Sequence, residues 1–306
     1  MAEGSDIPER GGLGRGHVPV LLQEAIEFLA VKSAGIYIDA TVGLGGHSLE
    51  IVRRLGQAGR LIGVDKDAGA LAIARARLSA DGRQDYPEVT LLHRSFAGLR
   101  RGLGLKVDGL LADIGVSSLQ LDRAERGFSF QAEGPLDMRM DTESGRTAEQ
   151  VVNQIDEVTL ADLIYEFGEE RRSRRIARAI VRSRPIRTTV ELADVVSAAA
   201  RPMNQAERRI HPATKTFQAL RIFVNRELED LRELLNEAPA VLKPGGRLVV
   251  ISFHSLEDRI VKDALREGVK QGQYRLLVKK PLTAGAQEIE RNPRSRSAKL
   301  RVAERL

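Results

Sequence analysis

The chain has 306 residues, enough for one large α/β domain or a core domain with an insertion. Its 48 Lys and Arg exceed its 42 Asp and Glu, and the net charge of +6 permits a polyanionic partner without proving one. The chain contains no Cys, which excludes a disulfide framework, a thiolate metal site and catalysis by a cysteine nucleophile.

The first residues indicate where the protein resides. Residues 1–16 contain five Gly and no apolar run, which is typical of a flexible leader rather than a secretion signal. No apolar run in the sequence approaches the ~20 residues that would span a bilayer. We therefore expect a soluble, cytoplasmic protein without a membrane partner.

The next part of the chain alternates between short apolar strands and helices. Apolar residues at helical spacing predict a first helix over residues 21–29. Strands are predicted over residues 36–40, 60–65, 89–93 and 107–113, and helices over residues 47–55 and 68–78. This alternation is typical of a doubly wound, mostly parallel sheet of the α/β class.

The alternation stops after residue 113, and roughly a hundred residues pass before the next core strand at 247–253. Charged helical patterns in between predict an inserted all-helical domain, with helices over residues 160–167, 171–182 and 190–200. One long helix over 215–235 and a turn at 243–246 should return the chain to the sheet. Residues 274–279 and 299–303 are expected to form two terminal strands.

These patterns divide the chain into four segments. The predicted segments are a leader (1–16), the first part of the sheet domain (17–120), the inserted helical domain (121–222) and the second part of the sheet domain (223–306).

A glycine-rich loop, DATVGLGGH over residues 39–47, follows the first strand and opens a helix. Asp65 ends the second strand 19 residues beyond Gly46, where a carboxylate can accept hydrogen bonds from both ribose hydroxyls of an adenosine cofactor. Nicotinamide dinucleotides and S-adenosylmethionine both use this geometry. The loop lacks the third glycine of a pyrophosphate site, and Asp39 would favour a cationic sulfonium or ammonium, so S-adenosylmethionine is preferred.

Six longer motifs occur in the chain: DATVGLGGHS (39–48), DIGVSS (113–118), RGFSF (126–130), LDMRMD (136–141), KTFQALR (215–221) and SFHSLED (252–258). Together they resemble the bacterial small-subunit (16S) ribosomal RNA cytosine-N4 methyltransferase family. The resemblance runs from about residue 17 to the last residue. It implies a class I methyltransferase (Rossmann-like) sheet with an inserted substrate-recognition domain. It also implies methylation of a cytosine in the decoding region of 16S rRNA, within the small ribosomal subunit.

The resemblance also assigns the binding site of the methyl donor. By motif, Gly45, Gly46 and His47 would contact its methionine end, Asp65 its ribose and Phe96 the surroundings of its adenine, while Asp113 and Gln120 would complete the pocket. From the residues alone, Phe96 would be an ordinary core aromatic and Gln120 a surface residue.

The chemistry needs a group that orients the target amine. The exocyclic amine of cytosine is a poor nucleophile, so the enzyme must hold it in line with the methyl group and accept its hydrogen bonds. Asp113, at the carboxyl end of the fourth strand, is the first candidate. His254 and Asp137 are further candidates, with a buried strand-end histidine and an Asp137–Arg139 salt bridge as alternatives. We expect no metal.

Aromatic and basic residues suggest contacts with RNA. Phe128 and Phe130 are candidates to stack on the target base, although anchoring the inserted domain is the commoner role for such residues. Residues 171–187 hold eight Arg and no acid, and residues 291–306 hold six Lys or Arg against one acid. Such clusters suit phosphates. We interpret four residues of the first cluster as RNA contacts: Arg171, Arg174, Arg175 and Arg178.

Two other functions stay open at this point. One is a nicotinamide-dependent oxidoreductase on the same fold, and the other is a non-catalytic RNA-binding protein with a vestigial cofactor pocket. Stabilisation by S-adenosylmethionine but not by NAD would exclude the first, and turnover would exclude the second. The sequence does not determine the oligomeric state, and a homodimer is compatible with it.

Overall fold

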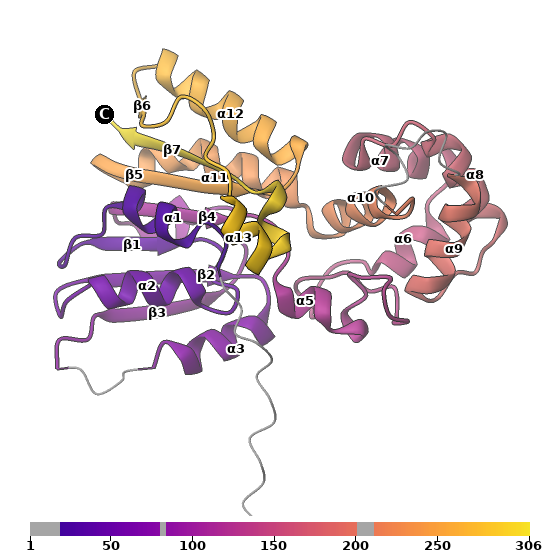
Figure 1. Ribbon diagram of the computed structural model, residues 1–306, viewed down its shortest axis with the longest axis horizontal. Helices are drawn as coiled ribbons and strands as arrows, with labels where there is room; N and C mark the ends of the chain where they lie inside the picture. Colours follow the sequence, from indigo (N-terminus) through magenta and orange to yellow (C-terminus); the bar gives the residue numbers. More distant parts are fainter. Residues whose placement is uncertain (1–18, 80–83, 201–210) are drawn as a thin grey trace, which may run out of the picture.

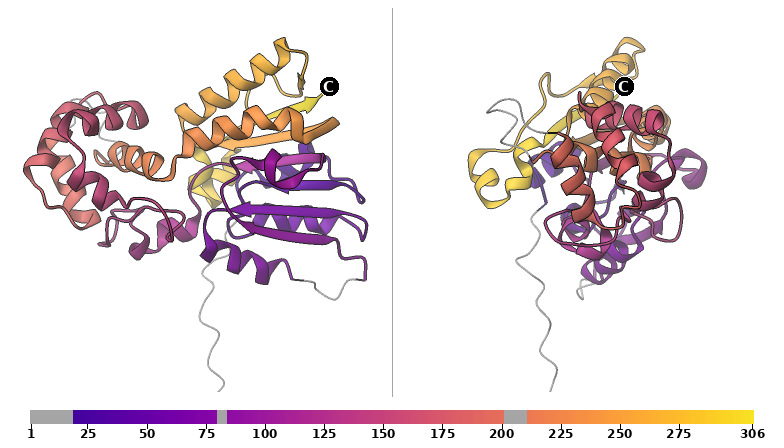
Figure 2. Two further views of the ribbon diagram at one scale, coloured as in Figure 1. Left: turned by 180° about the vertical axis from the view of Figure 1, so that it is seen from behind. Right: turned by 90° about the vertical axis from the view of Figure 1, so that its right-hand side faces the viewer.

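The computed structural model describes residues 19–79, 84–200 and 211–306, so the predicted leader over residues 1–16 lies outside the described residues. Figure 1 shows a sheet with helices on both faces and a second group of helices at one end of the sheet, and Figure 2 shows the same arrangement from two other sides. Across the described ranges, no helix combines the length and the apolar composition needed to cross a membrane.

Seven strands of the described chain form one sheet in the order β3-β2-β1-β4-β5-β7-β6. The strands are β1 (Ile36–Asp39), β2 (Arg60–Asp65), β3 (Glu88–His93), β4 (Val107–Asp113), β5 (Leu242–Ser252), β6 (Tyr274–Leu276) and β7 (Lys299–Arg305). Strands β1 to β5 pair in parallel, and β7 runs antiparallel between β5 and β6. The predicted fold class, a doubly wound and mostly parallel sheet, is confirmed.

The two faces of the sheet carry separate cores because neighbouring strand residues point to opposite faces. Tyr37 and Leu61 belong to one core, and Ile38 and Ile62 belong to the other. Helices α1 (Leu22–Leu29) and α2 (Gly46–Arg54) pack into the first core. Helices α4 (Leu99–Leu103), α11 (Glu227–Val241) and α12 (Ser255–Lys270) pack into the second. Helix α3 (Ala68–Arg77) packs beside β2 and β3.

A third core lies within the helices at the end of the sheet. These helices are α6 (Ala148–Gln154), α7 (Glu157–Gly168), α8 (Ser173–Arg182), α9 (Thr189–Ala199) and α10 (Thr214–Asn225). Their fully buried side chains include Ile164, Ile176 and Leu220. Helices α7, α8 and α9 correspond to the three helices predicted from sequence, whereas α6 was not predicted.

The prediction of one long helix over residues 215–235 is wrong. Helix α10 ends at Asn225 and α11 starts at Glu227, and Arg226 between them has a φ of 53°, in the left-handed region. Leu220 of α10 packs into the helical core and Leu231 of α11 packs on the sheet, so the chain passes from one core to the other at Arg226. The predicted domain boundary after residue 222 therefore falls inside α10.

The turn predicted at residues 243–246 is a bulge within β5. Leu242 pairs with Val107, and Arg247 pairs with Gly109. Between these two pairs, β5 contains more residues than β4. Gly245 adopts a φ of 76° in this bulge, a conformation that glycine adopts without strain, which explains why a glycine occupies this position.

Candidate active site

A pocket of about 1150 Å³, its open mouth included, lies at the carboxyl ends of β1, β2 and β4. The strand order reverses between β1 and β4, which is where open α/β sheets bind ligands. Most of the residues that the family resemblance assigns to the donor line this pocket: Gly46, His47, Asp65, Phe96, Asp113 and Gln120.

The glycine loop after β1 contributes backbone rather than side chains. Gly43 has a φ of 51°, lines the pocket and would have nothing within 4 Å of an added Cβ, so its backbone is open to a ligand. Gly45 does not line the pocket. It packs against α3 instead, where a Cβ on Gly45 would lie 3.3 Å from the Cβ of Ala74. A Cβ at Gly46 would lie 2.3 Å from Pro19. The structure thus gives Gly45 a packing role and does not place it against a donor.

Asp65 shapes the loop as well as the pocket. Its Oδ2 accepts a hydrogen bond from the Gly43 N–H (2.7 Å), and its Oδ1 accepts one from the Asp67 N–H (2.8 Å). Burial raises the pKa of Asp65 above its usual range, although these backbone donors oppose the rise. Each carboxylate oxygen accepts more than one hydrogen bond, so Asp65 can also accept bonds from ribose hydroxyls.

Asp67 is a buried carboxylate that the sequence analysis missed. Its Oδ1 accepts hydrogen bonds from the backbone N–H groups of Gly69 (3.0 Å) and Ala70 (3.1 Å), which caps α3. Its Oδ2 accepts bonds from Gln120 Nε2 (2.9 Å) and from Arg126 Nη1 (2.8 Å). An Asp directly before an Ala-rich helix is an N-cap signal that could have been found from sequence.

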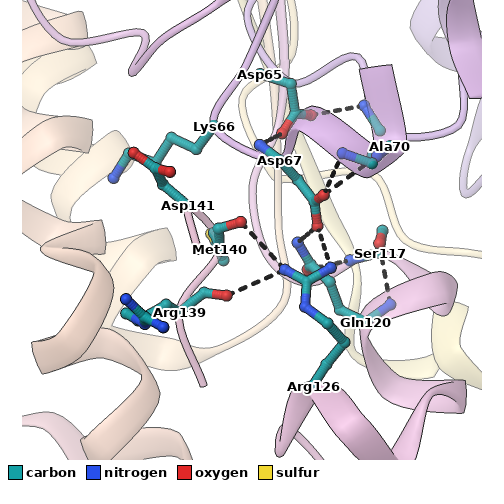
Figure 3. Close-up of polar contacts among 12 residues, drawn as sticks. Asp65, Lys66, Asp67, Ala70, Ser117, Gln120, Arg126, Arg139, Met140 and Asp141 are labelled. Carbon is teal, nitrogen blue, oxygen red and sulfur yellow. Dashed lines mark hydrogen bonds and ion pairs between the residues drawn. The ribbon is translucent and has the colours of Figure 1, made fainter. Parts of the chain in front are cut away.

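Arg126 connects this carboxylate to the segment that leads into the helical group. Figure 3 shows its guanidinium between Asp67 and the carbonyl oxygens of Arg139 and Met140, which lie 3.0 and 3.1 Å from Nη2. Met140 lines the pocket. The Arg126 side chain therefore fixes one pocket wall.

Gln120, on α5 (Ser118–Asp122), is buried and both ends of its amide are engaged. Its Nε2 donates to Asp67, and its Oε1 accepts from the Ser117 N–H at 3.0 Å. The residue lines the pocket, as the resemblance implies, and it also holds α5 against the start of α3.

Asp113 ends β4 inside the pocket. Its Oδ1 is buried without a hydrogen-bond partner within the described part of the chain, and its Oδ2 lies 3.6 Å from His47 Nδ1. Burial raises the pKa of Asp113 well above its usual range, and the nearby Asp39 and Glu257 carboxylates add to the rise. An unsatisfied buried oxygen at a strand end is the arrangement expected where a ligand completes the hydrogen bonding.

Asp39, at the end of the neighbouring strand β1, is fully buried. It accepts hydrogen bonds from Ser48 Oγ (2.6 Å) and from the Thr41 N–H (3.1 Å). Burial nevertheless raises the pKa of Asp39 to about 6. The ends of β1 and β4 thus hold two carboxyl groups whose ionised forms a bound cation would stabilise.

Glu227, which no sequence pattern singles out, brings a further carboxylate to the pocket from the first turn of α11. Arg221 binds both of its oxygens, each at 2.9 Å. Burial raises the pKa of Glu227 despite this partner. Arg221 lies in α10 and Glu227 lies in α11, so this ion pair bridges the junction of the two helices at Arg226.

The structure does not support catalytic roles for His254 and Asp137, because neither lines the pocket. His254 caps α12, and its Nε2 lies 3.0 Å from Glu257 Oε1. Asp137 binds Arg139 through both oxygens at 2.8 and 2.9 Å. Burial alone would raise the pKa of Asp137, but the Arg139 guanidinium outweighs it and holds the pKa below its usual range.

The structure also does not support base stacking by Phe128 and Phe130. Phe128 is buried, and Phe130 packs against the core of the helical group. The Phe130 ring centroid lies 4.8 Å from that of Phe217 and 4.5 Å from that of His211. The contacts of Phe130 agree with the anchoring role that the sequence analysis gave as the alternative, whereas the centroid of the Phe128 ring lies 5.8 Å from the guanidinium carbon of Arg126.

The four predicted RNA contacts, Arg171, Arg174, Arg175 and Arg178, are all exposed on α8 or just before it. The same run contains a structural arginine, because Arg184 Nε donates to the Val152 carbonyl at 2.8 Å. Arg171, Arg174 and Arg175 lie near the N-terminus of α8, where they add to the positive end of the helix dipole, whereas Arg178 pairs with Glu157 at 3.3 Å.

Within the described ranges, no group of three or more His, Asp or Glu side chains could hold a metal ion. The pocket does fit a cationic adenosine derivative. It offers open glycine backbone at Gly43, a strand-end carboxylate at Asp65 and an unsatisfied acidic oxygen at Asp113.

Comparison with known proteins gives a consistent result. The family described as the MraW methylase family matches residues 14–306. A protein of Koribacter versatilis named Ribosomal RNA small subunit methyltransferase H is 66% identical over 301 residues, which cover 97% of this chain and 96% of that protein. The protein of the same name from Acidobacterium capsulatum is 61% identical over 293 residues, which cover 94% and 98% of the two chains. The resemblance seen in the sequence motifs is confirmed: the chain belongs to the MraW methylase family.

Proposed function

We propose that the protein transfers a methyl group from S-adenosylmethionine to the exocyclic N4 amine of a cytosine in 16S ribosomal RNA. Membership of a methylase family and relatives named Ribosomal RNA small subunit methyltransferase H support this function. The structural observation that carries it is the buried, unpaired Oδ1 of Asp113 in the pocket at the strand-order reversal. Both of these relatives are named as methyltransferases, which does not support the nicotinamide-dependent oxidoreductase.

S-adenosylmethionine supplies an activated methyl group on a cationic sulfonium. Asp65 would hold the ribose hydroxyls, Phe96 would lie against the adenine, and the backbone at Gly43 would allow close approach of the methionine end. The buried carboxyl groups of Asp39 and Asp113 would offset the positive charge.

Asp113 is the group that would orient the amine. Its Oδ1 has an open position for an N–H of the amine, which keeps the nitrogen lone pair pointed at the methyl group. As the nitrogen gains the methyl group it becomes positive and must lose a proton. Because its surroundings raise the pKa of Asp113, its carboxylate is a stronger base than an exposed one and can take that proton.

The helical group α6 to α10 would bind the RNA, with the arginine cluster on α8 contacting phosphates. The target cytosine would lie in the decoding region, and the substrate would be the RNA within the small ribosomal subunit. The predicted limits of the inserted domain, residues 121–222, become residues 123–225 in this proposal, so that all of α10 is included.

The direct test is product analysis. Small ribosomal subunits from a strain that lacks this enzyme are incubated with the purified protein and isotope-labelled S-adenosylmethionine, and the RNA is digested to nucleosides for mass spectrometry. We expect N4-methylcytidine at one position of the 16S rRNA. Methylation of a ring carbon or of another base would contradict the proposal, and absence of any transfer would restore the non-catalytic alternative.

Asp113→Asn should reduce methyl transfer in a single turnover by roughly 10² to 10³, the usual loss for a preorganised polar group at a reaction centre. The measurement uses saturating donor and RNA, and circular dichroism checks that the variant is folded. A folded variant within threefold of the wild-type rate would remove Asp113 from the mechanism.

Asp39→Asn should change how stability depends on pH. The native carboxyl titrates at about 6 and an unfolded one at about 3.9, so the native state holds an extra proton between these values and loses stability as the pH rises through them. The Asn variant has no carboxyl to titrate at this position, so it does not lose this stability. Its free energy of unfolding relative to the wild type should therefore rise by up to about 3 kcal/mol between pH 4 and pH 8, measured by urea denaturation.

Asp108→Asn is the matched control for this experiment. Burial favours the protonated form of Asp108, but Lys243 and other donors outweigh it and lower the pKa of Asp108. This variant should therefore lose stability relative to the wild type as the pH rises. The same trend in both variants would contradict the electrostatic analysis of Asp39.

Replacement of Arg171, Arg174, Arg175 and Arg178 by Gln should weaken RNA binding and flatten its salt dependence. Each lost phosphate contact removes about 0.7 to 0.9 units of log–log slope, so four contacts would remove about three units. Donor binding should stay unchanged. The control replaces four exposed arginines on α2 and α3, namely Arg53, Arg54, Arg75 and Arg77. Equal losses in both variants would show that only net charge matters.

A further inference from the structure

A basic segment near the end of the described chain borders the mouth of the pocket. It consists of α13 (Ala286–Arg291) and the short 3-10 helix Pro293–Ser297. Figures 1 and 2 show α13 at the end of the sheet that faces the helical group. Asn292 and Arg294 line the pocket, although no motif in the sequence assigned them to it.

A contact with the start of α1 and a contact within the segment hold it in place. Glu288 Oε1 accepts a hydrogen bond from the Leu21 N–H at 2.7 Å, which ties α13 to the start of α1. Ser295 is fully buried and its Oγ donates to the Asn292 carbonyl at 2.8 Å. The position of Arg294 at the mouth is therefore built into the fold.

The charges of the segment are unequally compensated. Glu288 and Glu290 lie in α13, whereas residues 291–301, from the end of α13 into β7, include five Lys or Arg and no acid. Two of these residues, Lys299 and Arg301, share the carboxylate of Asp258 at 3.1 and 2.7 Å. The other three, Arg291, Arg294 and Arg296, are exposed.

Arg294 has a partner that it can exchange. Its Nη2 lies 2.6 Å from Asp122 Oδ1, and the two side chains are 46% and 63% exposed. Exposed ion pairs of this kind contribute only about 0 to 1 kcal/mol. The planar guanidinium fits a phosphate through two parallel hydrogen bonds, so a phosphodiester can replace the carboxylate at little cost.

The carboxyl groups that line the pocket favour a cation at its mouth. Asp65, Asp113 and Glu227 all contribute carboxyl groups to the lining. An RNA strand that inserts a base must bring its own phosphates close to these groups, and like charges repel at such distances. A guanidinium at the mouth lies where it can offset this repulsion.

We propose that Arg294 binds the RNA phosphate beside the target nucleotide, and that Asp122 holds its guanidinium in place until the phosphate displaces the carboxylate. This inference rests on the proposed function, because it takes RNA as the substrate. It adds a specific anchor for the strand, at the pocket and away from the arginine cluster on α8.

Two substitutions with opposite expected effects test the proposal. Affinity for purified 16S rRNA is measured over a range of salt concentrations. Arg294→Gln should lower the affinity about tenfold and reduce the log–log salt slope by about 0.7 to 0.9 units. Asp122→Asn should raise the affinity severalfold, because it removes the competing anion. The double variant should match Arg294→Gln.

Arg275→Gln is the matched control. Arg275 is also exposed and also paired with one carboxylate, that of Glu304, but it lies on β6. Glu304 pairs in the sheet with Arg247, toward the amino end of β5 and so away from the pocket. This variant loses the same charge and should keep wild-type RNA affinity.

Three results would overturn the proposal. If Asp122→Asn weakens RNA binding as Arg294→Gln does, the ion pair is structural. If Arg294→Gln weakens binding of S-adenosylmethionine and leaves RNA affinity unchanged, the guanidinium serves the carboxylate of the donor. If Arg294→Gln and Arg275→Gln have equal effects, only net charge matters. These are binding measurements, so failure to find N4-methylcytidine would contradict the proposed function separately.

Discussion

The carboxylate of Asp67 is the interaction on which the arrangement of the protein depends. It is buried, and it accepts hydrogen bonds from two backbone N–H groups of α3, from Gln120 and from Arg126. A buried charge is tolerated when its partners replace the lost water, and loss of one partner leaves the charge uncompensated. Through Arg126 the same carboxylate reaches the carbonyl of Met140. The Asp67 carboxylate therefore contributes both to the shape of the donor pocket and to the attachment of the helical group.

Parallel strands create the electrostatic character of the site. Because their carboxyl ends meet at one edge, Asp39, Asp65 and Asp113 are brought together, and burial raises the pKa of each. Such a cluster costs stability when all its members ionise without a cation. A donor that carries a sulfonium offsets this cost, whereas a pyrophosphate would increase it. The fold thus favours one class of cofactor before any specific contact is made.

Local patterns predicted the parts of the structure that depend on local forces. The strands over residues 60–65 and 107–113 agree with the structure, because an apolar run bounded by polar residues is sufficient to define a buried strand. The left-handed residue Arg226 was missed because the helical periodicity continues on both sides of it. The contact between Asp67 and Arg126 joins residues far apart in the chain, which no local pattern reveals. His254 shows a limit of local patterns, because a helix cap and a catalytic base look alike in a sequence and the structure shows it as the N-cap of α12.

The position of β7 has a consequence for how the protein is made. Strand β7 lies between β5 and β6 although it follows both in the chain, so neither can complete its hydrogen bonding until residues 299–305 have been synthesised. Until then the edge of β5 is open to pairing with another chain. The segment at the pocket mouth, residues 286–297, lies between Leu282 and β7, and Leu282 forms a bridge with Leu300 of β7. Completion of the sheet and of the bridge beside the pocket mouth therefore depends on residues 299–305, which are synthesised after both of the strands that they pair with.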